Sequence, residues 1–173
     1  MTQYVISLAV LILVPLALQI RRVPIWALFL VAGLIFFALA VLDTVETNTA
    51  LTALDAGRVP NVDFMRNVHS APWGAAAMLM IACLVWAQER YGALSRPRLT
   101  RALFWVLLAA LLVESGRRIF LVWLLQPRDG IVSMAFIQAI SAVFTGARGI
   151  GMLAFAGLVV LGLWSLVRAR SRS

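Results

Sequence analysis

Long apolar segments separated by short polar ones dominate the chain. A helix needs roughly twenty apolar residues to cross the hydrocarbon region of a bilayer, because it rises about 1.5 Å per residue. Five segments approach or exceed that length: residues 4–20, 23–42, 71–87, 102–125 and 149–167. The pattern therefore predicts an all-α fold, with five transmembrane helices in a single membrane domain that covers residues 1–173.

Prolines and hydroxyl side chains mark where several of these helices begin. Pro24 and Pro72 fall in the first turns of the second and third segments, where an amide proton has no partner inside the helix. Ser70 and Thr100 precede the third and fourth segments as expected N-caps. Pro15 lies inside the first segment, which we expect it to kink.

Two further segments do not fit this scheme of spans. Residues 43–70 are polar and contain turn signals, and long connections without a regular pattern are often functional. Residues 131–145 are apolar but too short to cross a bilayer. We expect them to form a short interfacial or re-entrant helix on the outer face. A long extension of the fifth helix is the alternative.

The composition indicates a membrane protein. Hydrophobic residues make up 63% of the chain and charged residues 13%, with a mean hydropathy of +0.97. A soluble domain is about half apolar and a quarter charged. No basic residue precedes the first apolar segment and no small-residue cleavage site follows it, so we expect a retained helix rather than a signal peptide. The predicted location is a bacterial-type inner membrane, crossed several times.

The arginines predict the orientation. All 15 basic residues are arginine, and the net charge is +8. With five spans, nine of them fall on one side: Arg21, Arg22, Arg90, Arg96, Arg98, Arg101, Arg168, Arg170 and Arg172. The positive-inside rule makes this side cytoplasmic, so the N-terminus is outside and the C-terminus inside. The arginines then meet anionic lipid headgroups, and no nucleic-acid partner is needed to explain the charge.

The fourth segment contains three charged residues. Glu114, Arg117 and Arg118 share one face of the predicted helix, at spacings of three and four. Glu114 lies about 18 Å from Ala102, near the middle of the bilayer, where a charge costs a few kcal/mol. The cluster is interpreted as a salt bridge that fixes packing, as an ion, proton or polar-ligand site, or as a counter-charge for a partner subunit. Both arginines have the alternative of extending to the outer headgroups.

A polar stripe precedes the fifth segment. Gln138, Ser141, Thr145 and Arg148 recur at spacings of three, four and three, so on a helix they lie along one face. The stripe is either the water-facing side of an interfacial helix or the lining of a polar cleft that faces Glu114. In the second interpretation, Arg148 shares the carboxylate of Glu114 with Arg117 or Arg118.

Three outer residues are candidates for acid/base chemistry. Asp43, Asp63 and His69 could form a pair or a divalent-cation site at the membrane edge, with Asp129 as a further carboxylate. The alternative is that they are solvated residues of helix ends and loops. With one cysteine and one histidine, the chain cannot form an internal disulfide, a cysteine cluster or a bis-histidine haem site, and we expect no cofactor.

Three functions remain open. The sequence has no H-E-x-x-H, G-x-S-x-G, Walker A or C-x-x-C motif. The favoured hypothesis is an accessory subunit of a larger inner-membrane assembly, packed against other membrane proteins or its own copies. The second is a small transporter or channel component that uses the Glu114 cluster. The third, and least favoured, is an enzyme that acts on a lipid-linked substrate at the outer leaflet.

Overall fold

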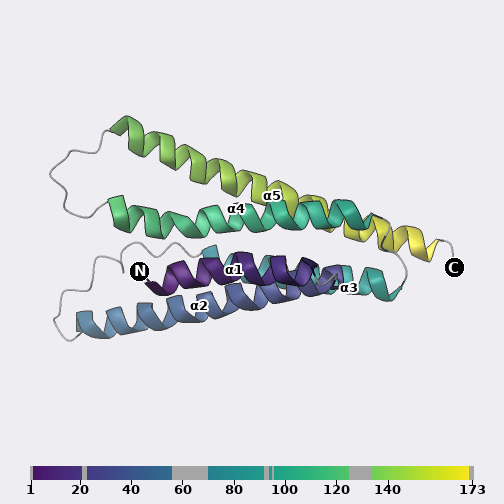
Figure 1. Ribbon diagram of the computed structural model, residues 1–173, viewed down its shortest axis with the longest axis horizontal. Coiled ribbons are helices and arrows are strands. Elements are labelled where there is room, and N and C mark those ends of the chain that lie inside the picture. Colours follow the sequence, from purple (N-terminus) through teal and green to yellow (C-terminus); the bar gives the residue numbers. More distant parts are fainter. Residues whose placement is uncertain are drawn as a thin grey trace.

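The computed structural model describes residues 2–20, 23–55, 70–91, 94, 96–124 and 134–171. Side chains are described within these ranges except at 2–8, 11, 43–55, 70–71, 116–124, 134 and 137. The described residues form helices and no strand, which confirms the all-α prediction (Figure 1). The helices are α1 Thr2–Ile20, α2 Ile25–Asp55, α3 Ser70–Arg90, α4 Pro97–Leu124 and α5 Met134–Arg170.

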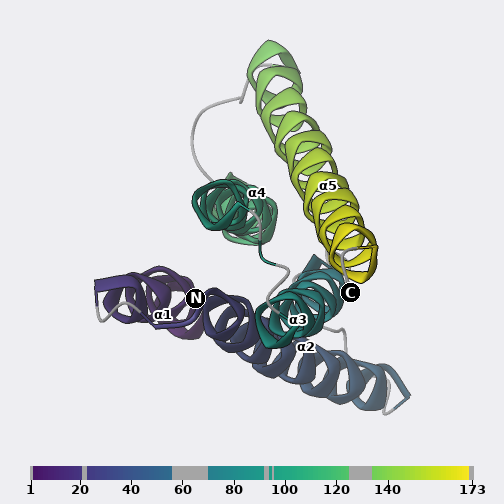
Figure 2. The same cartoon turned by 90° about the vertical axis from the view of Figure 1, so that its right-hand side faces the viewer.

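The helices lie side by side in two groups. Figures 1 and 2 show α1, α2 and α3 on one side of the molecule and α4 and α5 on the other. The most extensive packing is between α2 and α3 and between α4 and α5, and α3 also contacts α5. In Figure 1 the helices converge toward the C-terminus of the chain, and α5 diverges from α4 toward its own N-terminus.

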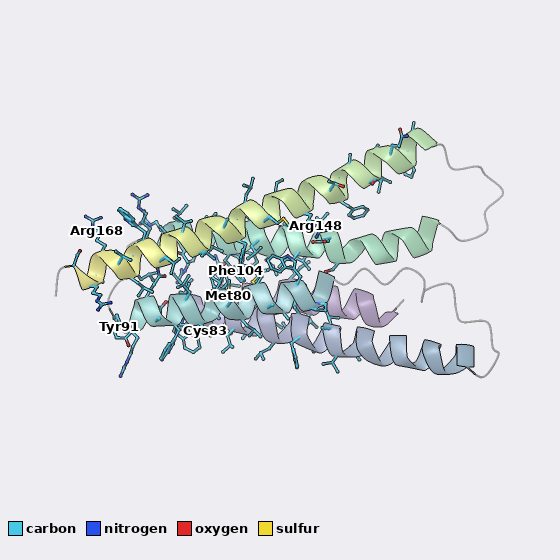
Figure 3. The ribbon with its side chains drawn as sticks, turned by 180° about the vertical axis from the view of Figure 1, so that it is seen from behind. Met80, Cys83, Tyr91, Phe104, Arg148 and Arg168 are labelled. Atoms are coloured by element: carbon cyan, nitrogen blue, oxygen red, sulfur yellow. The ribbon has the colours of Figure 1, made fainter. Side chains whose placement is uncertain are left out.

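One hydrophobic core joins α2, α3, α4 and α5. The rings of Phe29 and Phe104 meet edge to face, with centroids 4.8 Å apart. Gly33 allows α2 to approach α3 closely, because a Cβ there would lie 2.8 Å from Leu79 Cγ and 3.2 Å from the Leu79 backbone nitrogen. The large fully buried side chains are apolar, apart from Gln88. Phe104 is one of them and lies between α4 and the other helices of the core (Figure 3).

The prediction of an irregular connection over residues 43–70 is wrong for its first part. Helix α2 continues through the polar residues to Asp55, and is 31 residues long. The segment contains good helix formers at Ala50, Leu51, Ala53 and Leu54, and the first glycine comes only at Gly57. Helix formation here does not require an apolar sequence, which is why hydropathy placed the end too early.

The prediction of a separate short helix over residues 131–145 is also wrong. The structure has one continuous helix of 37 residues, α5, so the alternative of a long extension of the fifth helix is the one observed. Gly146, Gly149 and Gly151 do not break it. A glycine in a helix interior costs only about 1 kcal/mol, and no proline follows to end the helix.

Two helices carry segments that are long and apolar enough to cross a membrane, judged over the described residues. These are Ile25–Leu42 in α2 and Gln138–Arg170 in α5. Only 33% and 28% of these segments is buried inside the protein, so most of their residues are not part of its core. The core helix of a soluble protein is instead mostly buried. The two helices therefore indicate membrane association, and the three further spans remain predictions.

Candidate functional site

An ion pair joins α4 to α5 near the point where the two helices separate. Arg148 Nε on α5 lies 4.0 Å from Glu114 Oε1 on α4 (Figure 3). The Glu114 side chain is 11% exposed and that of Arg148 is 61% exposed. The mostly buried carboxylate of Glu114 is therefore paired with the exposed guanidinium of Arg148. One turn further along α5, a Cβ on Gly151 would lie 3.1 Å from Ala110 Cβ. The backbones of α4 and α5 are therefore close together next to the ion pair.

The distance shows what this ion pair can contribute. At 4.0 Å the two atoms attract electrostatically but are too far apart for a hydrogen bond. A pair with one exposed partner typically contributes about 1 kcal/mol or less. The larger consequence is for Glu114, because a covered carboxylate that loses its cation is left in an unfavourable environment. The pair therefore links α4 to α5, and its role in fixing the packing of the two helices stays a prediction.

Several predicted site residues lie outside the described part. Arg117 and Arg118 lie in helix α4, but their side chains are not described. The pairing of these side chains with Glu114 therefore stays a prediction. The same holds for the side chain of Asp43 on α2. Asp63, His69 and Asp129 lie wholly outside the described residues. The acid/base hypothesis therefore has no geometry to support it.

The polar stripe does not converge on Glu114. Gln138, Ser141 and Thr145 are exposed on α5, and the Thr145 hydroxyl donates to the Ser141 carbonyl oxygen of the same helix at 2.9 Å. Among the four stripe residues, Arg148 is the one for which an ion pair with another helix is seen. The stripe as described is thus an exposed helix face, and the polar cleft around the carboxylate stays a prediction.

A buried polar contact joins α3 to α5 at the C-terminal end of the bundle. Gln88 Nε2 donates to the Gly162 carbonyl oxygen at 3.0 Å, and both residues are buried. A Cβ on Gly162 would overlap Leu84, so glycine allows the close approach that the bond needs. Sequence reasoning missed this contact, because Gln88 follows directly after the third apolar segment, 71–87, and its partner lies on another helix.

Two further polar contacts link helices at the same end of the bundle. Glu89 on α3 accepts a hydrogen bond from the backbone amide of Ile25, the first residue of α2, at 3.2 Å. A carboxylate at that position satisfies a free amide and interacts well with the helix dipole. Trp105 Nε1 on α4 donates to Gln19 Oε1 on α1. Polar side chains therefore link α1 to α4, α2 to α3 and α3 to α5 at this end.

The described residues show what the chain offers to a metal ion and where its surface is grooved. Nowhere among them do three histidine, cysteine or carboxylate side chains gather where they could hold a metal ion. The surface grooves beside α2 are lined by apolar side chains, and a third groove between α4 and α5 carries two arginines. The arrangement is suited to packing against apolar or anionic partners. No protein-family model, curated protein or solved structure matches the chain.

Proposed function

We propose that this protein is an accessory subunit of an inner-membrane assembly, that its five helices span the membrane, and that the N-terminal half of α5 packs against another membrane protein. The observation that carries the proposal is a face of small residues on α5 with open space above it.

The lengths of the remaining helices support five spans. At about 1.5 Å per residue, α1, α3 and α4 are roughly 28, 32 and 42 Å long, close to or above the 30 Å of hydrocarbon that a span must cross. They pack alongside α2 and α5, which carry the apolar segments. A helix that packs along a membrane-spanning helix over such a length lies in the same membrane.

The arginines of α5 support a particular depth in the bilayer. Arg148 and Arg168 are about 30 Å apart along the helix, the thickness of the hydrocarbon region. With these two residues at the two boundaries, residues 134–147 extend beyond the outer one. This extension carries small side chains that the fold of the chain leaves exposed, among them Ala142 and Gly146. An exposed apolar surface outside the hydrocarbon is a site for protein contact.

One face of this extension consists of small side chains. At 100° per residue, Ser141, Ala142, Thr145, Gly146 and Gly149 fall on the same side of α5. A Cβ on Gly146 or Gly149 would meet nothing within 4 Å. The fold of the chain itself therefore does not need glycine at these positions. Small residues allow a second helix to approach closely, which is how helices associate in membranes.

The partner we propose is a helix of a different membrane protein. A symmetric contact between two copies through α5 would bring both Arg148 side chains to the same height beside the contact. Both side chains reach the surface there, since Arg148 is 61% exposed, and two like charges placed side by side disfavour the contact. A partner helix with an acidic or carbonyl acceptor at that height would instead complete its hydrogen bonding.

A bulky substitution on the small face tests this proposal. Gly149→Leu should abolish co-purification of the partner in gentle detergent, because the side chain holds the partner helix away. Ala156→Leu is the matched control, since Ala156 is exposed on the same side of α5 two turns further along. It should retain the partner. Mass spectrometry of the purified protein measures both, and equal partner recovery from the two variants would overturn the proposal.

A transporter or channel component is the second candidate, and the covered carboxylate of Glu114 supports it. Glu114→Gln separates the two functions. In a subunit, the change weakens the α4–α5 crossing and therefore the assembly. In a transporter, it blocks flux while the assembly persists. Parallel measurement of partner recovery and of proton or ion flux in vesicles distinguishes these outcomes.

A further inference from the structure

A groove lies between α4 and α5 at the end of the pair opposite to Arg148. Its volume is about 500 Å³, and it runs between the start of α4 and the last turns of α5. Its walls are mainly apolar, and Arg96 and Arg168 belong to its lining. Figure 3 shows Arg168 near the C-terminal end of the bundle. The apolar part is formed chiefly by Leu99, Leu103, Gly157, Val160 and Leu161.

The dimensions of the groove match one leaflet of a bilayer. Gly157 and Arg168 are about 16 Å apart along α5, and one leaflet contributes about 15 Å of hydrocarbon. A Cβ on Gly157 would lie 3.8 Å from Leu103, in ordinary contact with it. Because glycine has no side chain, this part of the groove floor is left unfilled. An acyl chain could follow this floor from the middle of the bilayer to the headgroup region.

The charges of the groove are of one sign. Arg96 directly precedes α4 and Arg168 lies on α5, both are exposed, and no acidic residue belongs to the lining. The position of Arg96 is fixed by the start of α4, because its carbonyl oxygen accepts from the Thr100 amide and hydroxyl, each at 3.1 Å. Trp164 lines the same end, at the depth where tryptophan prefers the membrane interface.

We infer that this groove binds one anionic phospholipid of the cytoplasmic leaflet. The two guanidinium groups hold the phosphate, which they recognise through charge-assisted hydrogen bonds, and an acyl chain lies on Leu103, Gly157 and Val160. The apolar walls select a lipid over free phosphate. The absence of a lining carboxylate disfavours zwitterionic headgroups, whose ammonium group would find no partner. The inference rests on the membrane-spanning arrangement proposed above and is independent of the accessory-subunit role.

Native mass spectrometry of the purified protein tests the site. The protein is titrated with phosphatidylglycerol or phosphatidylcholine in detergent, and bound lipid is counted. We expect one retained phosphatidylglycerol and no comparable retention of phosphatidylcholine. Arg96→Gln with Arg168→Gln should lower the retention on the order of tenfold. The matched control is Arg90→Gln with Arg98→Gln, which removes the same charge from exposed residues that do not line the groove. It should retain the lipid.

A second variant tests the apolar part of the groove with both arginines intact. Gly157→Leu should fill the floor and lower phosphatidylglycerol retention to a similar extent. Inorganic phosphate in excess should not displace the lipid, because it lacks the acyl chain. Equal losses in the groove and control double variants would overturn the inference, as would equal retention of the two lipids. Neither result depends on whether a protein partner co-purifies, so this site and the subunit proposal can fail separately.

Discussion

At the scale of single residues, the side chains that determine the packing are small or polar. Gly33 and Gly162 allow close helix approach, and Gln88 and Glu89 satisfy backbone groups of other helices. The large apolar residues fill the core, but they are abundant throughout the chain and one can often replace another. The positions that require one particular residue type are those where the space is limited or where a backbone group of another helix needs a hydrogen-bond partner.

Gly33 gives the clearest stability prediction. Gly33→Ala should lower the free energy of unfolding by about 1–3 kcal/mol, because the methyl group overpacks the α2–α3 contact against Leu79. Gly149→Ala is the control, since a Cβ there meets nothing. It should raise the stability of the isolated protein by up to about 1 kcal/mol through helix propensity. Thermal unfolding in detergent measures both. A Gly33→Ala midpoint at or above that of wild type would contradict the packing described.

Sequence reasoning identified part of the candidate site at this scale. The spacing of Gln138, Ser141, Thr145 and Arg148 allowed the interpretation that Arg148 shares the carboxylate of Glu114, and the structure brings these two side chains within 4.0 Å. The contacts of Gln88 and Glu89 were not predictable. Their partners are backbone groups 74 and 64 residues away, and periodicity contains no information on such pairings.

At the scale of helices, hydropathy predicts where apolar segments lie but not where helices end. It indicated five helical segments, and the described residues contain five helices in that order. It failed at Asp55 and at Met134, where α2 and α5 extend beyond their apolar segments. A backbone continues as a helix as long as its residues permit helical geometry, and polar residues such as Thr, Asn and Gln do so at a cost below 1 kcal/mol each.

Cysteine labelling distinguishes five spans from two. Single cysteines are introduced at Tyr91, Ala135 and Ser171 in a Cys83→Ser background and labelled in intact cells with a membrane-impermeant maleimide. With five spans, Ala135→Cys reacts from outside, whereas Tyr91→Cys and Ser171→Cys react only after permeabilisation. If only α2 and α5 cross, positions 91 and 135 lie on the same side, and Tyr91→Cys labels like Ala135→Cys. That result would exclude the spans proposed for α3 and α4.

At the scale of the whole molecule, the two ends of the bundle differ. Among the described residues, the polar contacts named above link four pairs of helices, the pair of Glu114 and Arg148 included. Three of these links lie at the end toward which the helices converge. The groove with two arginines lies at this end as well. At the other end α5 separates from α4 (Figure 1). The small residues on one face of α5 are exposed there. The account therefore assigns lipid contact to the closed end and protein contact to the open end.

Site-specific photo-cross-linking in the native membrane tests the central claim most directly. A photoreactive amino acid is placed at Thr145, on the small face of α5, and in a separate variant at Val143. Side chains two residues apart on a helix point in directions that differ by about 200°. Val143 is therefore a control at similar depth on the opposite face. The account predicts that position 145 cross-links to one other membrane protein and that position 143 does not. Cross-linking to lipid alone at position 145, or equal protein cross-linking at both positions, would contradict it.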